Sequence, residues 1–182
     1  MYQGNILFLL TGSIACYKAC AVISQLTQAG VTVETVATPS ALRFVGKATL
    51  EGLSGRPVFT YLWEEGRALD HIELARAADL ALVCPATANT INRMASGLSD
   101  DPVGALFLAW ELDQKPWWIA PAMNHRMWKH PATVSSLSKL REWGVQVIDP
   151  VDGAHACGEE GGGRLPEPED IAAKVLALLA KK

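Results

Sequence analysis

The segment PAMNHRMW, at residues 121–128, carries side chains suited to binding a small molecule. It follows a short apolar run at 117–120, which predicts a buried strand ending at a proline. Ligands of open α/β sheets bind just beyond the carboxyl ends of such strands. Asn124 can donate and accept hydrogen bonds without carrying charge, and Met127 offers polarizable apolar surface. The segment fits either a pocket wall or a strand-to-helix turn with Asn124 as N-cap, and alone it favours neither.

Three more segments that end predicted strands carry small and hydroxyl-bearing residues: 11–15 (TGSIA), 38–41 (TPSA) and 84–90 (CPATANT). Gly12 permits close approach of a ligand, and Ser13 can cap a helix whose first amides receive an anion. Taken singly, each segment fits an ordinary helix cap. Together, at one sheet edge, they predict a mononucleotide cradle. FMN fits this cradle better than NAD because the GxGxxG pattern of dinucleotide sites is missing.

The segment ACGEEGGGRL, at 156–165, lies within a longer glycine-rich stretch, 149–167, that is predicted to be irregular. Its glycines allow a mobile flap over a substrate, in which Cys157 can act as a proton donor or nucleophile. The alternative is a flexible surface loop with an incidental thiol. His71 opens a predicted helix and suits acid/base chemistry near neutral pH, although a lone histidine is more often structural or exposed. The histidines lack metal-ligand spacing, so no metal site is predicted.

Alternating strands and helices predict a single α/β domain over residues 1–182, a three-layer, doubly wound parallel sheet of the Rossmann or flavodoxin type. The predicted strands are 5–10, 31–37, 80–84, 116–120 and 145–148. The predicted helices are 13–29, 39–45, 47–53, 70–78, 88–97, 102–110, 131–143 and 168–180.

Composition narrows the classes of function. Of 182 residues, 49% are hydrophobic and 19% are charged, with a net charge of -3. Without a basic cluster or a long apolar run, we expect neither nucleic acid nor membrane as a partner. Four cysteines without paired spacing favour a reduced, cytoplasmic setting. Six tryptophans suggest that some face a ligand or another subunit.

With these segments collected, the chain resembles the homo-oligomeric flavin-containing cysteine decarboxylases over nearly its whole length. Residues 121–128 match the family's PxMNxxMW pattern, and residues 156–158 match its ACG substrate clamp. Residues 85–90 (PATANT) are similar to its PASANT segment, and His71 lies in the stretch that holds its active-site histidine. Glu159 and Leu165 depart from the family's usual Asp and Met, so the clamp geometry is expected to differ slightly.

The resemblance implies an FMN-dependent decarboxylation of 4'-phosphopantothenoylcysteine to 4'-phosphopantetheine in coenzyme A biosynthesis. In this mapping Asn124 holds the substrate carboxylate, His71 is the acid/base residue and Cys157 protonates the decarboxylated carbon. Asn124, Met127, Ala156 and Leu165 bind substrate. The implied FMN contacts are Gly12, Ser13, Ile14, Thr38, Ser40, Thr87, Ala88, Asn89, Thr90 and Ala122.

Assembly and substrate stay open at this point. The family implies a homotrimer or a homododecamer, with each flavin site shared between subunits, and many bacterial members carry a fused synthetase. The alternatives are a peptidyl-cysteine decarboxylase of the lantibiotic type, which stops at an enethiol, and a non-catalytic regulatory flavoprotein. Cys157 argues against the first, because that type lacks the clamp cysteine. The second typically carries a long acidic tail, which this sequence does not show.

Overall fold

Parallel strands form the centre of the computed structural model, which describes residues 4–63, 69–154 and 160–180. Within these residues the sheet has five strands in the order β2-β1-β3-β4-β5. Their bounds are β1 (Asn5–Leu10), β2 (Thr32–Ala37), β3 (Leu80–Ala86), β4 (Trp117–Pro121) and β5 (Gln146–Val147). The direction in which successive strands are added to the sheet reverses between β1 and β3. The connections that follow these two strands therefore run to opposite faces of the sheet, and a crevice lies between them beyond the carboxyl ends of the strands.

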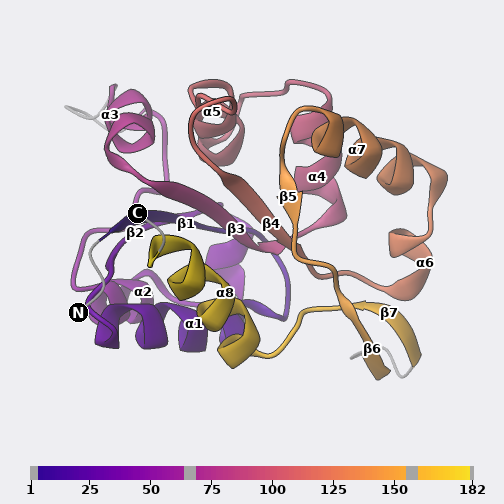
Figure 1. The fold of residues 1–182 in the computed structure, drawn as a ribbon, viewed down its shortest axis with the longest axis horizontal. Coiled ribbons are helices and arrows are strands. Elements are labelled where there is room, and N and C mark those ends of the chain that lie inside the picture. The colour runs from indigo at the N-terminus through magenta and orange to yellow at the C-terminus, as the bar shows by residue number, and fades with distance from the viewer. Residues whose placement is uncertain (1–3, 64–68, 155–159, 181–182) are drawn as a thin grey trace.

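Helices cover both faces of the sheet (Figure 1). One face packs against α1 (Cys16–Gln28), α2 (Lys47–Ser54) and α8 (Pro168–Leu179). The other packs against α3 (Asp70–Ala77), α4 (Ala88–Ala95), α5 (Pro102–Leu108) and α7 (Pro131–Glu142). The predicted α/β class, with three layers and a doubly wound parallel sheet, is confirmed.

The strand sequences explain why both faces need cover. In β1, Ile6 and Phe8 pack with the α1 side while Leu7 and Leu9 pack with the α5 side, and all four are fully buried. Successive side chains of a strand point to opposite faces, so a strand buried on both sides is apolar throughout. This is why the run NILFLL shows no polar alternation.

Several tryptophans belong to the core rather than to a ligand or subunit surface. Trp117 packs edge-to-face with Phe107 at a ring-centroid distance of 5.0 Å and with Trp110 at 5.5 Å. Trp118 is also buried, on the opposite face of β4. These three indoles fill the two hydrophobic cores, so the expected contact with a ligand or another subunit stays a prediction for the remaining tryptophans. Trp63, in contrast, is 78% exposed.

The segment 149–167 was predicted to be irregular, and this prediction is wrong in part, because the segment contains a β-hairpin. Strands β6 (Val151–Ala154) and β7 (Glu160–Arg164) pair antiparallel beside the short helix α6 (His125–Trp128), at the lower right of Figure 1. Glycine is depleted in strands, so the sequence hides this pairing. The structure gives a reason for glycine at 161, where φ is +147° and a Cβ would overlap the His125 ring. At Gly162 a Cβ would lie 3.3 Å from Asp152 Oδ1, a tight contact, and 3.5 Å from Trp128 Cδ1.

Smaller differences concern helix ends. The helix predicted from residue 13 begins at Cys16 after a turn, and the one predicted at 39–45 is a 3-10 turn, η1 (Ala41–Arg43).

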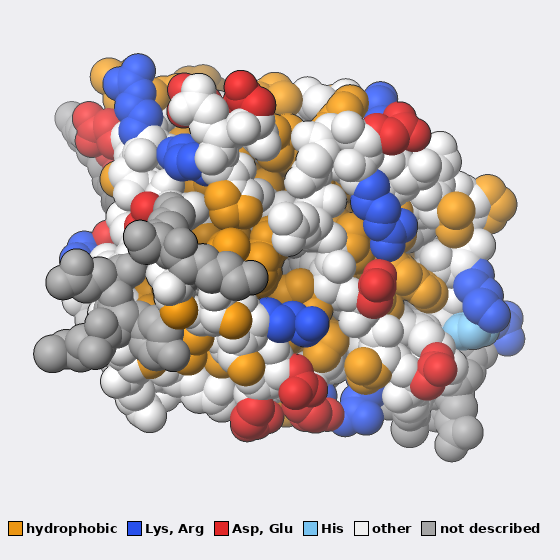
Figure 2. Space-filling model, viewed as in Figure 1, with side chains coloured by type: hydrophobic (Ala, Val, Ile, Leu, Met, Phe, Trp, Pro, Cys, Tyr) orange, Lys and Arg blue, Asp and Glu red, His pale blue; other side chains and the backbone are white. Residues whose placement is uncertain are grey.

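The surface charges are mixed in sign. Lys and Arg side chains are interspersed with Asp and Glu on the face in Figure 2, so this face carries no large patch of one charge. Within the described ranges, the helices are too short or too polar to cross a bilayer.

Candidate functional site

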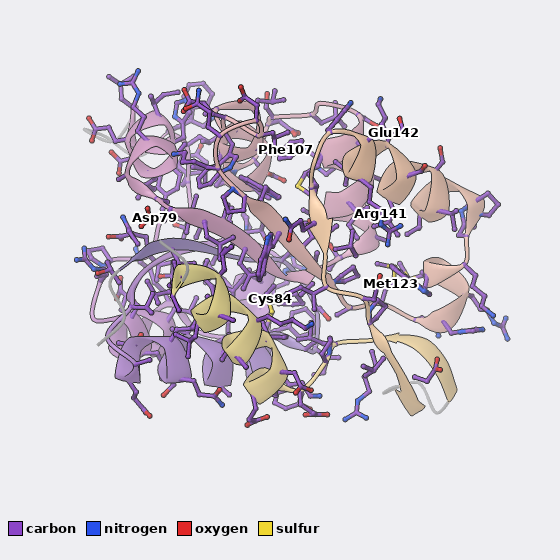
Figure 3. All side chains as sticks on the ribbon, viewed as in Figure 1. Asp79, Cys84, Phe107, Met123, Arg141 and Glu142 are labelled. Carbon is purple, nitrogen blue, oxygen red and sulfur yellow. The ribbon has the colours of Figure 1, made fainter. Side chains whose placement is uncertain are left out.

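A cavity of about 950 Å³ lies beyond the carboxyl ends of β1, β2, β3 and β4. Figure 3 gives its position: Met123, which lines it, lies where the strands run toward the hairpin, while Asp79 marks the opposite end of the sheet. Small-molecule sites have volumes of about 300–1,000 Å³, and in open α/β sheets they lie at this edge. The cavity is therefore large enough for a tricyclic ring and a substrate.

Backbone hydrogen bonds join the loops around this cavity. The amide of Thr38 donates to Leu10 O at 3.1 Å, and the amide of Ala122 donates to Ala86 O at 3.1 Å. Thr11 joins the first and third loops, because its Oγ1 donates to Pro85 O at 2.6 Å and accepts from Thr87 N at 3.0 Å. Thr11 was not predicted, although a threonine directly after an apolar strand was the available signal.

The predicted cradle loops meet as expected. All ten predicted cofactor residues line the cavity: Gly12, Ser13, Ile14, Thr38, Ser40, Thr87, Ala88, Asn89, Thr90 and Ala122. Gly12 lies against the second loop, since a Cβ there would be 2.6 Å from Ser40 Cβ. Their part in holding a cofactor stays a prediction.

The cap alternative also holds for one of these hydroxyls. Thr87 is the N-cap of α4, since its Oγ1 accepts from Thr90 N at 3.4 Å. Thr38 Oγ1 accepts from Ala41 N at 3.2 Å and Ser13 Oγ accepts from Ala15 N at 3.2 Å, but these are local turns: the predicted N-cap role of Ser13 is wrong, because Ala15 precedes α1. A hydroxyl that accepts from an amide still carries a hydrogen that it can donate. Such local hydrogen bonds and ligand binding are therefore compatible at these positions.

Asn124 satisfies both of the alternatives for its segment. Its Oδ1 accepts from Arg126 N at 2.8 Å, which makes Asn124 the N-cap of α6, and its side chain also lines the cavity. Met127, on the same short helix, lines the cavity and is 49% exposed. The short helix α6 thus presents Asn124 and Met127 on one wall.

The opposite wall comes from the end of β7. Gly163, Arg164 and Leu165 line the cavity, and Lys18 of α1 lines it beside them. Leu165 is a predicted substrate contact, whereas Lys18 and Arg164 were not predicted. Lys18 could not be predicted because its partners, Leu165 and Glu167, are remote in sequence.

The structure places one of the three remaining predicted residues, His71. Ala156 and Cys157 lie outside the described residues. His71, in the first turn of α3, is half-buried and does not line the cavity of its own chain. Its Nδ1 is buried and makes no hydrogen bond within the described part of the chain. One chain alone therefore does not bring His71 to Asn124.

Other titratable groups near the cavity are structural. Burial raises the pKa of the Cys16 thiol, and burial likewise raises that of Cys84, so both stay protonated at neutral pH. A hydrogen bond from Lys18 lowers the pKa of Glu167 and keeps it ionised. No group of three or more His, Cys, Asp or Glu able to hold a metal occurs in the ranges that the structure covers.

These features fit a flavin nucleotide. Small residues and Gly12 leave space for a flat ring, while Ser13, Thr38 and Ser40 gather hydroxyls at one end of the cavity. The start of α1 borders the cavity, since Tyr17 and Lys18 line it, and helix N-termini are common phosphate sites.

Comparison with known proteins gives the family. The family model described as "Flavoprotein" matches residues 1–180, and the chain belongs to this family. The bifunctional coenzyme A biosynthesis protein CoaBC of Mycobacterium bovis is 44% identical over 172 residues, 94% of this chain and 40% of that protein. The chain thus spans about 40% of the length of such relatives. A probable phosphopantothenoylcysteine decarboxylase of Streptococcus mutans is 38% identical, with 94% of this chain and 96% of that protein covered.

Solved structures agree with this assignment. A Cys-to-Ser mutant of a PPC decarboxylase, complexed with pantothenoylaminoethenethiol, superposes with a TM-score of 0.87 at 32% identity, covering 99% of this chain and all of that one. The FMN-binding protein AtHal3 gives a TM-score of 0.84 at 32% identity, covering 98% of both chains. The resemblance to flavin-containing cysteine decarboxylases, inferred from the motifs, is confirmed.

Proposed function

We propose that this chain is the FMN-dependent decarboxylase that converts 4'-phosphopantothenoylcysteine to 4'-phosphopantetheine in cytoplasmic coenzyme A biosynthesis. The observation that carries the proposal is the composition of one cavity. Three small-residue loops form its floor, Asn124 and Met127 form one wall, and residues 163–165 form the other. Two relatives that match this chain over nearly their full length, in sequence as well as in fold, support this substrate. We assign residues 1–182 to one flavin-binding domain, in which 149–167 is the substrate clamp.

The cofactor of the proposal is FMN, held by the ten loop residues that line the cavity floor. Bound FMN supplies a reversible hydride acceptor, so a carboxylate beside a thiol-bearing carbon can leave without net oxidation. The backbone hydrogen bonds between loops fix the cavity shape before the ligand binds.

The roles of the chain's own side chains follow from their chemistry. Asn124 orients the substrate carboxylate through a neutral amide, which does not over-stabilise a group that is about to depart. Met127 and Leu165, which line the cavity, are assigned to substrate binding, and Ala156 is assigned to it from the motif alone. Cys157 delivers the proton to the carbon that loses the carboxylate.

His71 acts, in this proposal, from a neighbouring copy of the chain within a trimer or a dodecamer of trimers. Its distance from its own cavity and the unpartnered Nδ1 among the described residues support this arrangement. A histidine at the start of α3 can then serve as acid or base at a site whose other residues belong to the neighbour.

Complementation between inactive variants tests both parts of the proposal. The wild-type protein must release carbon dioxide from phosphopantothenoylcysteine, and peptides ending in cysteine serve as the alternative substrate, with products identified by mass spectrometry. His71→Asn and Cys157→Ser should each abolish turnover when expressed alone. Co-expressed, they should form mixed oligomers in which about one quarter of the sites are intact, because each site draws from two copies.

Two outcomes contradict the proposal in different ways. Turnover of the cysteine-ending peptide but not of phosphopantothenoylcysteine would overturn the substrate. Wild-type activity without any recovery in the mixed oligomers would overturn the shared site. Flavin absorbance of each variant provides the control for folding.

A further inference from the structure

Lys18 is a buried cation in an unusual place. It lies in the first turn of α1 and is 7% exposed. Lysine is rarely buried unless it is paired, and a positive charge near a helix N-terminus opposes the helix dipole. Helix stability therefore does not explain this residue, and its contacts must.

Those contacts all reach the segment between β7 and α8, about 147 residues away in sequence. Lys18 Nζ donates to the backbone oxygen of Leu165 at 3.3 Å and to Glu167 Oε1 at 2.9 Å. The same carboxylate oxygen of Glu167 accepts from Arg164 Nη2 at 2.7 Å. Two cations and one anion thus converge where the chain leaves the cavity wall.

The segment 163–165 is held from its other side as well. The amide of Met123, which leads into α6, donates to Gly163 O at 2.9 Å. The segment therefore runs as a bridge across the cavity, tied to α1 at Leu165 and to the β4–α6 connection at Gly163. The side chain of Leu165, 1% exposed, packs in the hydrophobic core on the α1 side of the sheet.

We infer that Lys18 is a positioning residue for substrate binding, which fixes the 163–165 wall against α1 through Leu165 and Glu167. This inference rests on the proposed function, because it concerns the same cavity. Lys18 acts through the wall and not on the reacting atoms. Its loss leaves the floor loops intact, since they are joined by their own backbone hydrogen bonds.

Paired variants with two independent readouts test the inference. Lys18→Met keeps the aliphatic stem and removes both hydrogen bonds. We expect the KM for phosphopantothenoylcysteine to rise about tenfold, as for the loss of one charge-assisted hydrogen bond, with kcat nearly unchanged. In the substrate-free protein, the amides of residues 160–165 should exchange hydrogen faster, while those of β1 and β3 should not.

Glu167→Gln is the second variant, because a half-exposed glutamate tolerates substitution even if Lys18→Met folds poorly. Its effect should be smaller, since Lys18 still reaches Leu165 O, and the two substitutions should be non-additive when combined. Arg56→Met is the matched control. It breaks the ion pair of Arg56 Nη1 with Glu34 Oε1, which is 2.7 Å long against 2.9 Å for Lys18 and Glu167, and neither Arg56 nor Glu34 lines the cavity.

The outcomes separate this inference from the proposed function. A wild-type protein without decarboxylase activity would overturn the proposed function. The hydrogen-exchange measurement would still test whether Lys18 holds the segment 163–165 through Leu165 and Glu167. An active wild-type protein, combined with wild-type KM and exchange in Lys18→Met and Glu167→Gln, would overturn the positioning role. Faster exchange in Arg56→Met to the same degree would also overturn it, since the effect would then be general.

Discussion

The two ends of the sheet are built from the same strands and differ in what closes them. At the amino end, side chains fill the space: Asn5 N donates to Asp79 Oδ2 at 2.8 Å, and Asn5 Nδ2 donates to Ala77 O at 3.2 Å. Lys115 Nζ, over the Trp110 ring, donates to Ala78 O at 3.2 Å. At the carboxyl end, small residues and backbone contacts enclose a cavity instead.

This difference separates stability from binding. Charged and amide side chains at the amino end satisfy backbone groups, so their removal should weaken the fold. At the carboxyl end the loops are joined by backbone hydrogen bonds and by the Thr11 hydroxyl, while other side chains line the cavity and can contact a ligand. Substitutions at the two ends should therefore affect different measurements.

Gly12→Ala should give the largest effect, and it should fall on the cofactor. The added Cβ would lie 2.6 Å from Ser40 Cβ, so the first two loops must move apart. Overpacking of about 1–3 kcal/mol corresponds to a loss of about 5- to 150-fold in flavin affinity. Titration of the apoprotein with FMN, followed by flavin fluorescence, measures it.

The matched control for this substitution is Gly52→Ala. A Cβ at Gly52, inside α2, would meet nothing within 4 Å, so stability should rise by about 0.5–1 kcal/mol with FMN affinity unchanged. An equal loss of FMN affinity in both variants would remove the steric explanation.

Asp79→Ala should give the second largest effect, and it should fall on the fold. It removes the acceptor of the Asn5 amide, which lowers the free energy of unfolding by about 1–3 kcal/mol. Urea denaturation measures this loss, and Asp113→Ala, at an exposed position before β4, should stay within about 0.5 kcal/mol. If Asp79→Ala instead weakened FMN binding and left the free energy of unfolding unchanged, the proposed division between a stabilising amino end and a binding carboxyl end of the sheet would be wrong.

The smallest effect concerns pH and the tie at the cavity wall. The Lys18 hydrogen bond holds the pKa of Glu167 below its usual range. A carboxyl whose folded pKa is depressed stabilises the protein above its unfolded pKa of about 4.3, and this contribution is lost as the pH falls through the folded value. The small difference in urea midpoint between wild type and Glu167→Gln should be present at pH 6 to 7 and should shrink steadily as the solution is acidified below about pH 4. A difference that stays constant with pH would exclude the ionised contact.

Much of the fold was readable from the sequence, because parallel strands buried on both faces are short apolar runs between amphipathic helices. The strand 5–10 was predicted with its observed bounds, and the cavity floor followed from the rule that loops gather at the carboxyl edge. The hairpin was missed because its glycines carry no alternation. They serve close packing on His125 and Trp128, a contact that depends on tertiary structure.

The walls of the site were harder to predict than its floor. Lys18 and Arg164 meet through Glu167, and no local pattern reveals a partner so far along the chain. The place of His71 is a question of assembly, which the periodicity of one chain does not address. The sequence motifs identified most of the predicted site residues, whereas the distances between these residues could be learned only from the folded structure.

The backbone hydrogen bonds that join the loops at Thr38 and Ala122 have a consequence for evolution. Backbone hydrogen bonds do not depend on the identity of the side chains that line the cavity. Loops joined in this way can therefore accept substitutions of the lining side chains one at a time. Descendants of such a scaffold can explore new thiol acids by single exchanges at an exposed lining position such as Met127, without first losing the ability to fold.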